Sequence, residues 1–490
     1  MVGTSRRALL RGGAGTLLGA GALGAAAGCG TDAGGVAAAP VRAPAGSLDP
    51  YFPGHGAGGF LVNRCEIDLV YSYSAARPAG SLRGAATIRI LPFTDLSGLS
   101  LDLASGLRVE SVQVNGSAAA FSRAAPDKIA ITPAAALPNA AMATLRIAYS
   151  GAPQPVPVAG VGPVGWQAAG PPAAPGSAGP LSLPIGAPTW YPCADHPTLK
   201  APYQISVTAP SELSVLANGE LSGKDSAHGA TTWTYLSDQP MASYLAAVHV
   251  GDFVLDTATG PKGVQIRNAY PARLAREAAY DLGRQAEMIR VFSTLFGTYP
   301  FAVFGTAALD GLPAAGATAQ TLGLLDAALL DGKRSTESQI AYSLAAQWFG
   351  ADTSPGTWAD IWLTTGFATY GQWLWAERSG GASADSAARA AMARLAALPA
   401  DLVLAGPGAQ RILDPRVALR GACFLHAQRL VAGDLAFFQL LALWADRGQG
   451  GSATTGDFLQ TVPSAYTAQD LTDFMNAWAY ATALPRLPQS

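Results

Sequence analysis

Histidine is the side chain that most often binds metals and transfers protons at neutral pH, and this sequence contains few of them. The five histidines lie far apart and show none of the spacings typical of metal ligands: His55, His196, His228, His249 and His426. The histidines alone therefore do not predict a metal centre.

Cysteine offers no alternative metal or redox site. Beyond position 29 the chain has three cysteines, Cys65, Cys193 and Cys423, and none of them belongs to a C-x-x-C pair. An odd number cannot all pair within one chain. Buried thiols are the favoured interpretation. The alternative, if the protein is exported, is one disulfide between two of the three cysteines.

The fourth cysteine, Cys29, ends a segment with the features of an export signal. Arg6 and Arg7 precede hydrophobic residues, as in twin-arginine signals, and a weakly apolar Gly/Ala/Leu stretch runs from residue 12 to residue 27. The ending Ala-Ala-Gly-Cys is similar to a bacterial lipobox, in which Cys29 would be lipidated. An ordinary secretion signal with a chance cysteine is the alternative. We expect residues 1–29 to be a lipoprotein signal peptide. The protein would then be exported by the twin-arginine route and held by lipid on the extracytoplasmic face of the cell membrane.

The composition excludes several classes of protein. The 490 residues carry a formal net charge of -2 and only 13% of them are charged, which leaves no electrostatic footprint for nucleic acid. After residue 30 no apolar run reaches the roughly 18 residues that a membrane span needs. The 56 glycines and 35 prolines fit many short strands joined by turns. We therefore expect folded domains outside the bilayer and no nucleic-acid partner.

Three parts follow the signal segment and would position any site. Residues 30–58 are rich in Gly, Ala and Pro without periodicity, which predicts a flexible tether. Residues 59–272 contain short runs with a period of two between turn residues. They predict an N-terminal β domain, with the Gly/Pro/Ala stretch 151–179 as a surface excursion. In residues 273–490 the spacing of apolar residues becomes that of helices.

Two segments of the helical part resemble a known family. Residues 337–350 read ESQIAYSLAAQWFG and residues 358–370 read WADIWLTTGFATY. They are similar to the H-E-x-x-H-Q-W-F-G and W-L-N-E-G-F-x-x-Y helices of the aminopeptidase N-like metallopeptidases, the gluzincins. The P-C-A-D-H-P turn at 192–197 and the R-G-A sequence at 420–422 also match. The resemblance, which is to the compact bacterial members, implies an α+β multidomain fold. An N-terminal antiparallel β domain would be followed by a mostly helical, thermolysin-like domain.

The resemblance also implies a zinc site, but the ligand positions are replaced. In the family, two histidines at i and i+4 and a glutamate on the next helix bind zinc and leave a position open for water. Tyr342, Ala346 and Thr365 hold these positions here. A phenol, a methyl group and a hydroxyl are not zinc ligands at neutral pH, so we expect neither zinc nor any other cofactor. We also expect Tyr342 to fill the vacated volume and to form a hydrogen bond with Thr365 or Ser343.

Three further positions that act in the family's reaction are replaced. The general base is Ser343, the glutamate that would hold the substrate's free amine is Thr318, and the tyrosine that would stabilise the tetrahedral intermediate is Ala418. Loss of one such stabilising group typically costs about 10²–10³ in rate. Residues 347–350 (QWFG) and Gly366, which serve packing in the family, are unchanged. The pattern predicts a pseudoenzyme that keeps the scaffold without the reaction.

Other residues near these positions could carry chemistry, but each also has a structural interpretation. Ser343 could act as a nucleophile only with a base, and the nearest histidine later in the chain is His426. His196 could bind a metal, yet it lies in a turn where polar residues serve structure. Asp360 and Glu377 neighbour the changed site in sequence but lack metal-ligand spacing to a histidine.

Two functions are open on this evidence. The favoured one is a catalytically inactive, aminopeptidase-like lipoprotein that acts as a binding or assembly factor in the cell envelope. A peptide or protein ligand would occupy the former substrate cleft at Tyr342, Ser343, Thr365 and Thr318. The alternative is a residual metallopeptidase or other hydrolase with a rearranged site.

Overall fold

The computed structural model describes residues 41–42, 49–125, 127–168, 177–312, 317–461 and 468–489. Pro40–Ser490 forms one unit. The predicted signal peptide with Cys29 and most of the predicted tether lie outside the described residues. Among the helices that the structure describes, none is long and apolar enough to cross a membrane.

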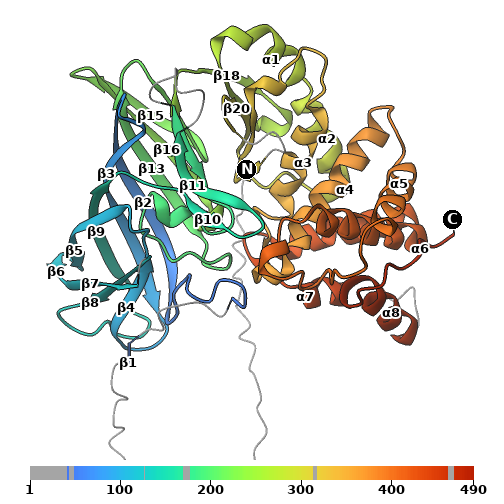
Figure 1. Cartoon of the computed structure of the whole chain (residues 1–490), viewed down its shortest axis with the longest axis horizontal. Helices are drawn as coiled ribbons and strands as arrows, with labels where there is room; N and C mark the ends of the chain where they lie inside the picture. The colour runs from blue at the N-terminus through green and yellow to red at the C-terminus, as the bar shows by residue number, and fades with distance from the viewer. Residues whose placement is uncertain are drawn as a thin grey trace, which may run out of the picture. The chain divides into compact units, whose positions relative to one another are not determined.

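An eight-stranded sheet forms the centre of the β domain, which is blue to green in Figure 1. Buried and exposed residues alternate along its strands, as at Ile67, Asp68 and Leu69, because successive side chains of a strand point to opposite faces. Neighbouring strands are antiparallel except β13 and β2, which are parallel. The predicted antiparallel β domain is thus confirmed. In sheet order the strands are β15 (Glu220–Ala227), β16 (Ala230–Met241), β13 (Ala201–Pro210), β2 (Phe60–Ser74), β3 (Arg77–Pro92), β9 (Ala143–Gly151), β5 (Leu107–Val114) and β6 (Ser117–Ala118).

Two smaller sheets complete this domain. One has the order β1 (Val41–Arg42), β4 (Leu96–Asp102), β8 (Lys128–Thr132) and β7 (Ala120–Ala125). The other has the order β10 (Val156–Val158), β11 (Gly162–Ala168), β12 (Ala178–Leu181), β17 (Val248–Gly251) and β14 (Ser214–Ala217). The prediction that 151–179 is a surface excursion was wrong, because β10 and β11 lie within it and Trp166 is fully buried. The indole N–H of Trp166 donates to the carbonyl of Ala79 at 2.8 Å.

A five-stranded sheet begins the second domain, in the order β18 (Val254–Thr259), β19 (Gln265–Tyr270), β20 (Val303–Leu309), β22 (Leu322–Asp326) and β21 (Ala317–Ala319). β19, β20 and β22 run parallel to one another. The predicted boundary between residues 272 and 273 falls inside this sheet, between β19 and β20. The change from strand to helical spacing therefore lies within one sheet, because the first two strands of this sheet precede it.

Helices make up the rest of the second domain, drawn in yellow to red in Figure 1. The helices are α1 (Ala275–Asp281), α2 (Gln285–Phe296), α3 (Glu337–Trp348), α4 (Trp362–Arg378), α5 (Ala384–Ala396), α6 (Pro415–Gly448), α7 (Thr455–Thr461) and α8 (Ala468–Met475). α6 is interrupted at Gly433, whose φ is 75°. The short turn η6 (Trp358–Asp360) precedes α4, and another short turn, η2 (Ser243–Leu245), lies in the β domain between β16 and β17. β23 (Ser354–Pro355) and β24 (Ser452–Ala453) form a small two-stranded sheet. The fold confirms the predicted β domain followed by a mostly helical domain.

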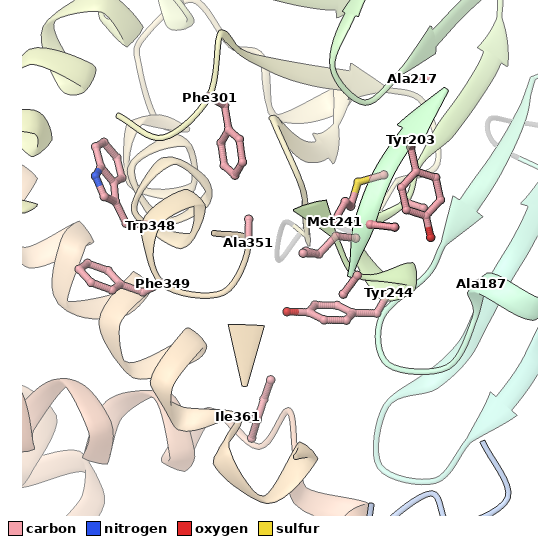
Figure 2. Packing of buried hydrophobic residues seen from close by; sticks show 14 of the residues in the cluster. Ala187, Tyr203, Ala217, Met241, Tyr244, Phe301, Trp348, Phe349, Ala351 and Ile361 are labelled. Carbon is pink, nitrogen blue, oxygen red and sulfur yellow. The ribbon is translucent and has the colours of Figure 1, made fainter. Parts of the chain in front are cut away.

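Two side chains, buried Tyr244 and half-buried Lys200, join the β domain to the segment that follows α3. The Tyr244 hydroxyl of η2 donates to the carbonyl of Gly350 at 2.6 Å, and Figure 2 shows this side chain reaching towards the segment that carries Ala351. Lys200 donates to the carbonyls of Ala351, Asp352 and Gly451 at 3.0, 2.6 and 2.9 Å. These bonds fix the end of α3 against the β domain.

The last ten residues of the predicted tether also belong to the folded unit. The buried carboxylate of Asp49 accepts the backbone N–H of Trp358 at 2.8 Å, and the Tyr51 hydroxyl accepts the N–H of Gly408 at 2.9 Å. We call Asp49–Gly59 the strap, because it connects the second domain to the start of β2. The prediction of a flexible tether was wrong for these residues, because buried hydrogen bonds to distant segments hold them.

Four charged or ionisable side chains hold the other end of the strap on the β domain. Lys128 Nζ lies 2.5 Å from Asp102 Oδ1, and His55 Nδ1 lies 3.5 Å from Asp195 Oδ2. Burial alone would lower the pKa of His55, but the hydrogen bond to Asp195 and the charges of Asp195 and Asp102 raise it. When His55 is neutral, the carboxylates of Asp102 and Asp195 face only the Lys128 ammonium group. Protonation of His55 adds a second positive charge and balances the two buried carboxylates.

Candidate functional site

The three positions that would hold zinc lie on neighbouring helices but present no metal ligands. Tyr342 and Ala346 are one turn apart on α3, and the methyl group of Ala346 is buried. Thr365 is near the start of α4, where its hydroxyl donates back to the carbonyl of Ile361 at 3.3 Å. In the part of the chain that the structure describes, no group of three or more His, Cys, Asp or Glu residues could hold a metal ion. The residues at this site do not fit zinc.

Tyr342 does not make the predicted hydrogen bond. Thr365 donates within its own helix and Ser343 points to the carbonyl of Ala317, 3.5 Å away. Among the described residues the Tyr342 hydroxyl has no hydrogen-bond partner, and the side chain is half-buried. Desolvation raises the pKa of Tyr342 to about 12, so the phenol stays protonated at neutral pH. The prediction was wrong because a helical threonine can satisfy its hydroxyl on the preceding turn.

Ser343 sits between α3 and the sheet rather than beside a base. A methyl group at Gly323 of β22 would lie 2.8 Å from Ser343 Cβ, so strand and helix are in close contact here. His426, the only histidine proposed as its partner, is engaged elsewhere: Nδ1 lies 3.3 Å from the Tyr370 hydroxyl and Nε2 lies 3.3 Å from Asp385 Oδ1. The Ser343–His426 alternative therefore has no support in the geometry.

A small cavity lies beside Thr318 on β21. Its volume is about 130 Å³, and the Thr318 hydroxyl is buried without a hydrogen-bond partner among the described residues. Among the residues that the structure describes, no acidic or basic side chain lines this cavity; its walls are Val161, Pro163, Val164, Pro180, Leu181, Ser182, Leu183, Tyr244, Ala246, Ala247, Ala317, Thr318, Ala319 and Leu324. The cavity can accept an apolar group, but it offers no carboxylate to a free amine.

Ala418 and the R-G-A sequence lie in the first turns of α6. Ala418 has only a methyl group, so it cannot donate a hydrogen bond to an oxyanion. Arg420 is buried, and burial lowers the pKa of its guanidinium to about 10. It donates to the carbonyls of Leu402, Ala477, Trp478, Ala481, Thr482 and Ala483. This arginine therefore holds the C-terminal segment through its backbone carbonyls.

The other acidic residues near the site also serve structure. Asp360 accepts the N–H and the hydroxyl of Thr455, both at 2.8 Å, and Glu377 accepts from Ala384 N and Arg429 Nη2. His196 Nδ1 lies 2.7 Å from the Thr198 hydroxyl within its own turn. Each of these three side chains is thus engaged in a structural contact, and none of them is placed as a general base for the site.

The retained packing residues explain why the scaffold persists. Gly366 of α4 and Gly421 of α6 lie at the closest approach of the two helices, where a methyl group on either would come within 2.9 Å of the other's Cα. Gln347 accepts the N–H of Thr321 at 2.7 Å and donates to the carbonyl of Ala319 at 3.1 Å. Both contacts need these residue types whether or not metal binds.

The cysteines agree with the favoured interpretation. Cys65, Cys193 and Cys423 are buried and unpaired. Burial raises the pKa of each thiol, which suppresses the reactive thiolate.

The β domain, the sheet with its edge strand β21, and the α3–α4 pair together define the two-domain architecture of zinc aminopeptidases. Residues 73–245 match the Peptidase M1 N-terminal domain and residues 304–478 match the Peptidase family M1 domain. The chain belongs to the M1 family, as an aminopeptidase N-like gluzincin, and the resemblance found in the sequence is confirmed.

Solved structures agree over nearly the whole fold. An M1 zinc metallopeptidase from Deinococcus radiodurans is 31% identical with a TM-score of 0.81, covering 90% of this chain and 98% of that chain. A mutant of an M1 zinc metallopeptidase from the same organism, bound to a Tyr-Ser-Ala substrate, is 31% identical with a TM-score of 0.80. That comparison covers 90% of this chain and 99% of that chain.

Curated relatives are longer proteins. Aminopeptidase N of Bos taurus is 30% identical over 205 residues, which are 38% of this chain and 21% of that protein. Aminopeptidase M1-B of Oryza sativa subsp. japonica is 29% identical over 197 residues, 38% of this chain and 22% of that protein. The chain thus spans about a fifth of the length of these relatives.

Sequence reasoning missed the residues that hold the two domains together. Lys200, Tyr244 and Asp49 were not singled out, because each bonds to backbone atoms far away in the chain. No local motif marks such a contact. A lysine or aspartate in an otherwise weakly charged chain is the only signal that could have indicated them.

Proposed function

We propose that this M1-family protein is catalytically inactive and acts as a binding or assembly factor in the cell envelope. One observation carries the proposal: Tyr342, Ala346 and Thr365 replace all three metal ligands. Peptide hydrolysis by the family's chemistry needs a metal-bound water and a base to deprotonate it. Ser343 replaces that base, and its hydroxyl faces a carbonyl rather than a histidine.

We further propose that a peptide or protein ligand occupies the former substrate cleft at Tyr342, Ser343, Thr365 and Thr318. The cavity beside Thr318 has apolar walls and no charged residue. A free amino terminus would lose water there without gaining a carboxylate. The ligand therefore presents an apolar side chain or a blocked terminus, unlike an aminopeptidase substrate.

Metal analysis and a peptidase assay on the purified protein test the loss of activity. We expect less than stoichiometric zinc and no cleavage of aminoacyl reporter substrates. One zinc ion per chain would overturn the proposal, because the ligand assignment would then be wrong. Cleavage that survives a chelator would instead support the alternative, a hydrolase with a rearranged site.

We also propose that Cys29 carries lipid and holds the protein on the extracytoplasmic face of the cell membrane after twin-arginine export. The support is the Ala-Ala-Gly-Cys ending after Arg6 and Arg7. Cell fractionation of Cys29→Ala tests the anchor. We expect the variant to leave the membrane fraction after a salt wash, and unchanged retention would contradict the lipid.

A further inference from the structure

Four apolar side chains gather on the outer face of the eight-stranded sheet, at one end. In the strand pairing, Leu61 of β2 lies opposite Leu91 of β3. Ile90 of β3 pairs with Ala143 of β9, so Met142, one residue before Ala143, lies beside Leu91 on the β9 side of β3. Phe93 lies just past the end of β3, where its N–H donates to the carbonyl of Gly59 at 3.1 Å, next to the start of β2. We call Leu61, Leu91, Phe93 and Met142 the apolar tip.

The apolar tip is uncovered in the described part of the chain. Phe93 is 60% exposed, Leu61 54% and Met142 49%, while their strand neighbours Phe60, Ile90 and Ala143 are buried in the core. Single exposed apolar residues are ordinary on a protein surface, but a contiguous row with an aromatic residue marks an interaction site.

A basic row lies directly behind the apolar tip. Arg64 pairs with Arg89 across β2 and β3, and Arg89 pairs with Thr144 of β9; the next row on β9 carries Arg146, which is exposed. Glu66 Oε1 lies 2.8 Å from Arg64 Nε and 3.9 Å from Arg89 Nη2. Two of these cations share one carboxylate and Arg146 contacts the Thr87 hydroxyl instead, so this row carries more positive than negative charge just behind the apolar residues.

The chain enters the folded unit at the same end of the domain. Val41 of β1 pairs with Leu96 of β4, three residues after Phe93, and β1 and β4 lie at the lower end of the β domain in Figure 1. Eleven residues lie between Cys29 and Val41, so the twelve steps of backbone span at most about 40 Å when fully extended. A lipid on Cys29 would keep this end of the domain close to the bilayer.

We propose that the apolar tip inserts into the interface of a phospholipid bilayer, with Arg64, Arg89 and Arg146 over anionic headgroups. Apolar side chains that enter the headgroup boundary, backed by cations, are the features that bind proteins to anionic membrane surfaces. The choice of a bilayer over a protein partner rests on the proposed lipid anchor. Insertion of the apolar tip fixes the orientation of the β domain relative to the membrane, whereas the lipid only limits the distance between the domain and the bilayer.

Flotation with vesicles tests the tip without the lipid. The full chain carrying Cys29→Ala is mixed with vesicles of phosphatidylcholine and phosphatidylglycerol, or of phosphatidylcholine alone. We expect binding to the anionic vesicles. Leu61→Ser with Phe93→Ser should reduce the partition coefficient on the order of tenfold or more, because apolar burial drives it. Arg89→Gln should reduce it about fivefold, and only with the anionic vesicles.

A matched control uses two leucines on α6, which is in the other domain. Leu435 and Leu443 are 77% and 42% exposed, so Leu435→Ser with Leu443→Ser removes equivalent apolar surface elsewhere. This control should float like the parent. Equal flotation of the tip variant and the parent would overturn the proposal, as would absence of flotation by the parent.

A fluorescent label reports the tip in the lipidated protein. The environment-sensitive dye NBD is attached at Phe93→Cys or, for comparison, at Leu435→Cys, and the native thiols are buried. A blue shift with vesicles at position 93 alone supports insertion, and equal spectra at both positions contradict it. If sedimentation shows a dimer that the tip substitutions dissociate, the face is a subunit interface and the proposal fails.

A separate experiment in cells tests the lipid anchor, so that its failure can be told apart from failure of the apolar tip. In cells, Cys29→Ala is combined with the two tip serines, so that neither contact remains. Membrane retention of this combined variant would refute the anchor, whereas the vesicle results decide the tip.

Discussion

The crossing of α4 and α6 offers a sharp test of how the scaffold holds the site positions. A methyl group added at Gly366 would lie 2.9 Å from the Cα of Gly421 and 3.1 Å from its carbonyl carbon. Both contacts are with backbone, which cannot rotate away as a side chain can. Gly366→Ala must therefore push the two helices apart.

Two opposing effects set the magnitude of this change. Overpacking a close contact costs about 1–3 kcal/mol, while replacing a glycine within a helix by alanine stabilises the helix by roughly 1 kcal/mol. The backbone contact is shorter than real Cβ atoms tolerate, so the cost lies at the upper end of its range. We expect Gly366→Ala to lower the free energy of unfolding by about 1–2 kcal/mol.

Gly456 provides the matched control, because a methyl group there in α7 would meet only Thr454 Oγ1, at 3.6 Å. Gly456→Ala should leave stability unchanged or raise it by up to about 1 kcal/mol. Urea unfolding followed by far-UV circular dichroism measures both variants. If Gly366→Ala proves as stable as Gly456→Ala, the close crossing of the helices is refuted.

Three further predictions follow from the site and the domain junction. The combined variant Tyr342→His, Ala346→His, Thr365→Glu should bind zinc by isothermal titration yet stay inactive, because Ser343 supplies no base. His55→Gln should weaken the pH dependence of stability. The pKa of His55 is raised in the folded protein, so protonation of His55 stabilises the fold fully at pH values below the usual histidine pKa of 6.5. This contribution is lost as the pH rises through the folded-state pKa. If the cluster were unimportant, urea midpoints plotted against pH would have the same slope in the variant and the parent protein. Lys200→Met should lower the free energy of unfolding by about 1–3 kcal/mol, because it leaves buried carbonyls without donors; an unchanged midpoint would show that water replaces the ammonium group.

The sequence by itself determined the fold class and predicted which chemistry is missing. Spacing of two residues predicted the β domain, and the i, i+4 relation placed Tyr342 and Ala346 on one face of a helix. These features are local, because they depend only on residues that are close together in the sequence. The inability of a phenol, a methyl group and a hydroxyl to bind zinc is a property of the side chains and needs no tertiary structure.

Only the tertiary structure decided which hydrogen-bond donors and acceptors pair and which side chains are buried together. Asp49 binds the N–H of Trp358, 309 residues away, and this contact turns part of a predicted tether into a strap. Composition suggested a surface excursion where Trp166 is buried, because one large aromatic side chain can find a partner sheet that the local sequence does not reveal. Thr365 satisfied its hydroxyl within its own helix, which left Tyr342 without the predicted partner. Such choices depend on which donors and acceptors meet once the chain is folded, and buried polar groups must find partners wherever the fold supplies them.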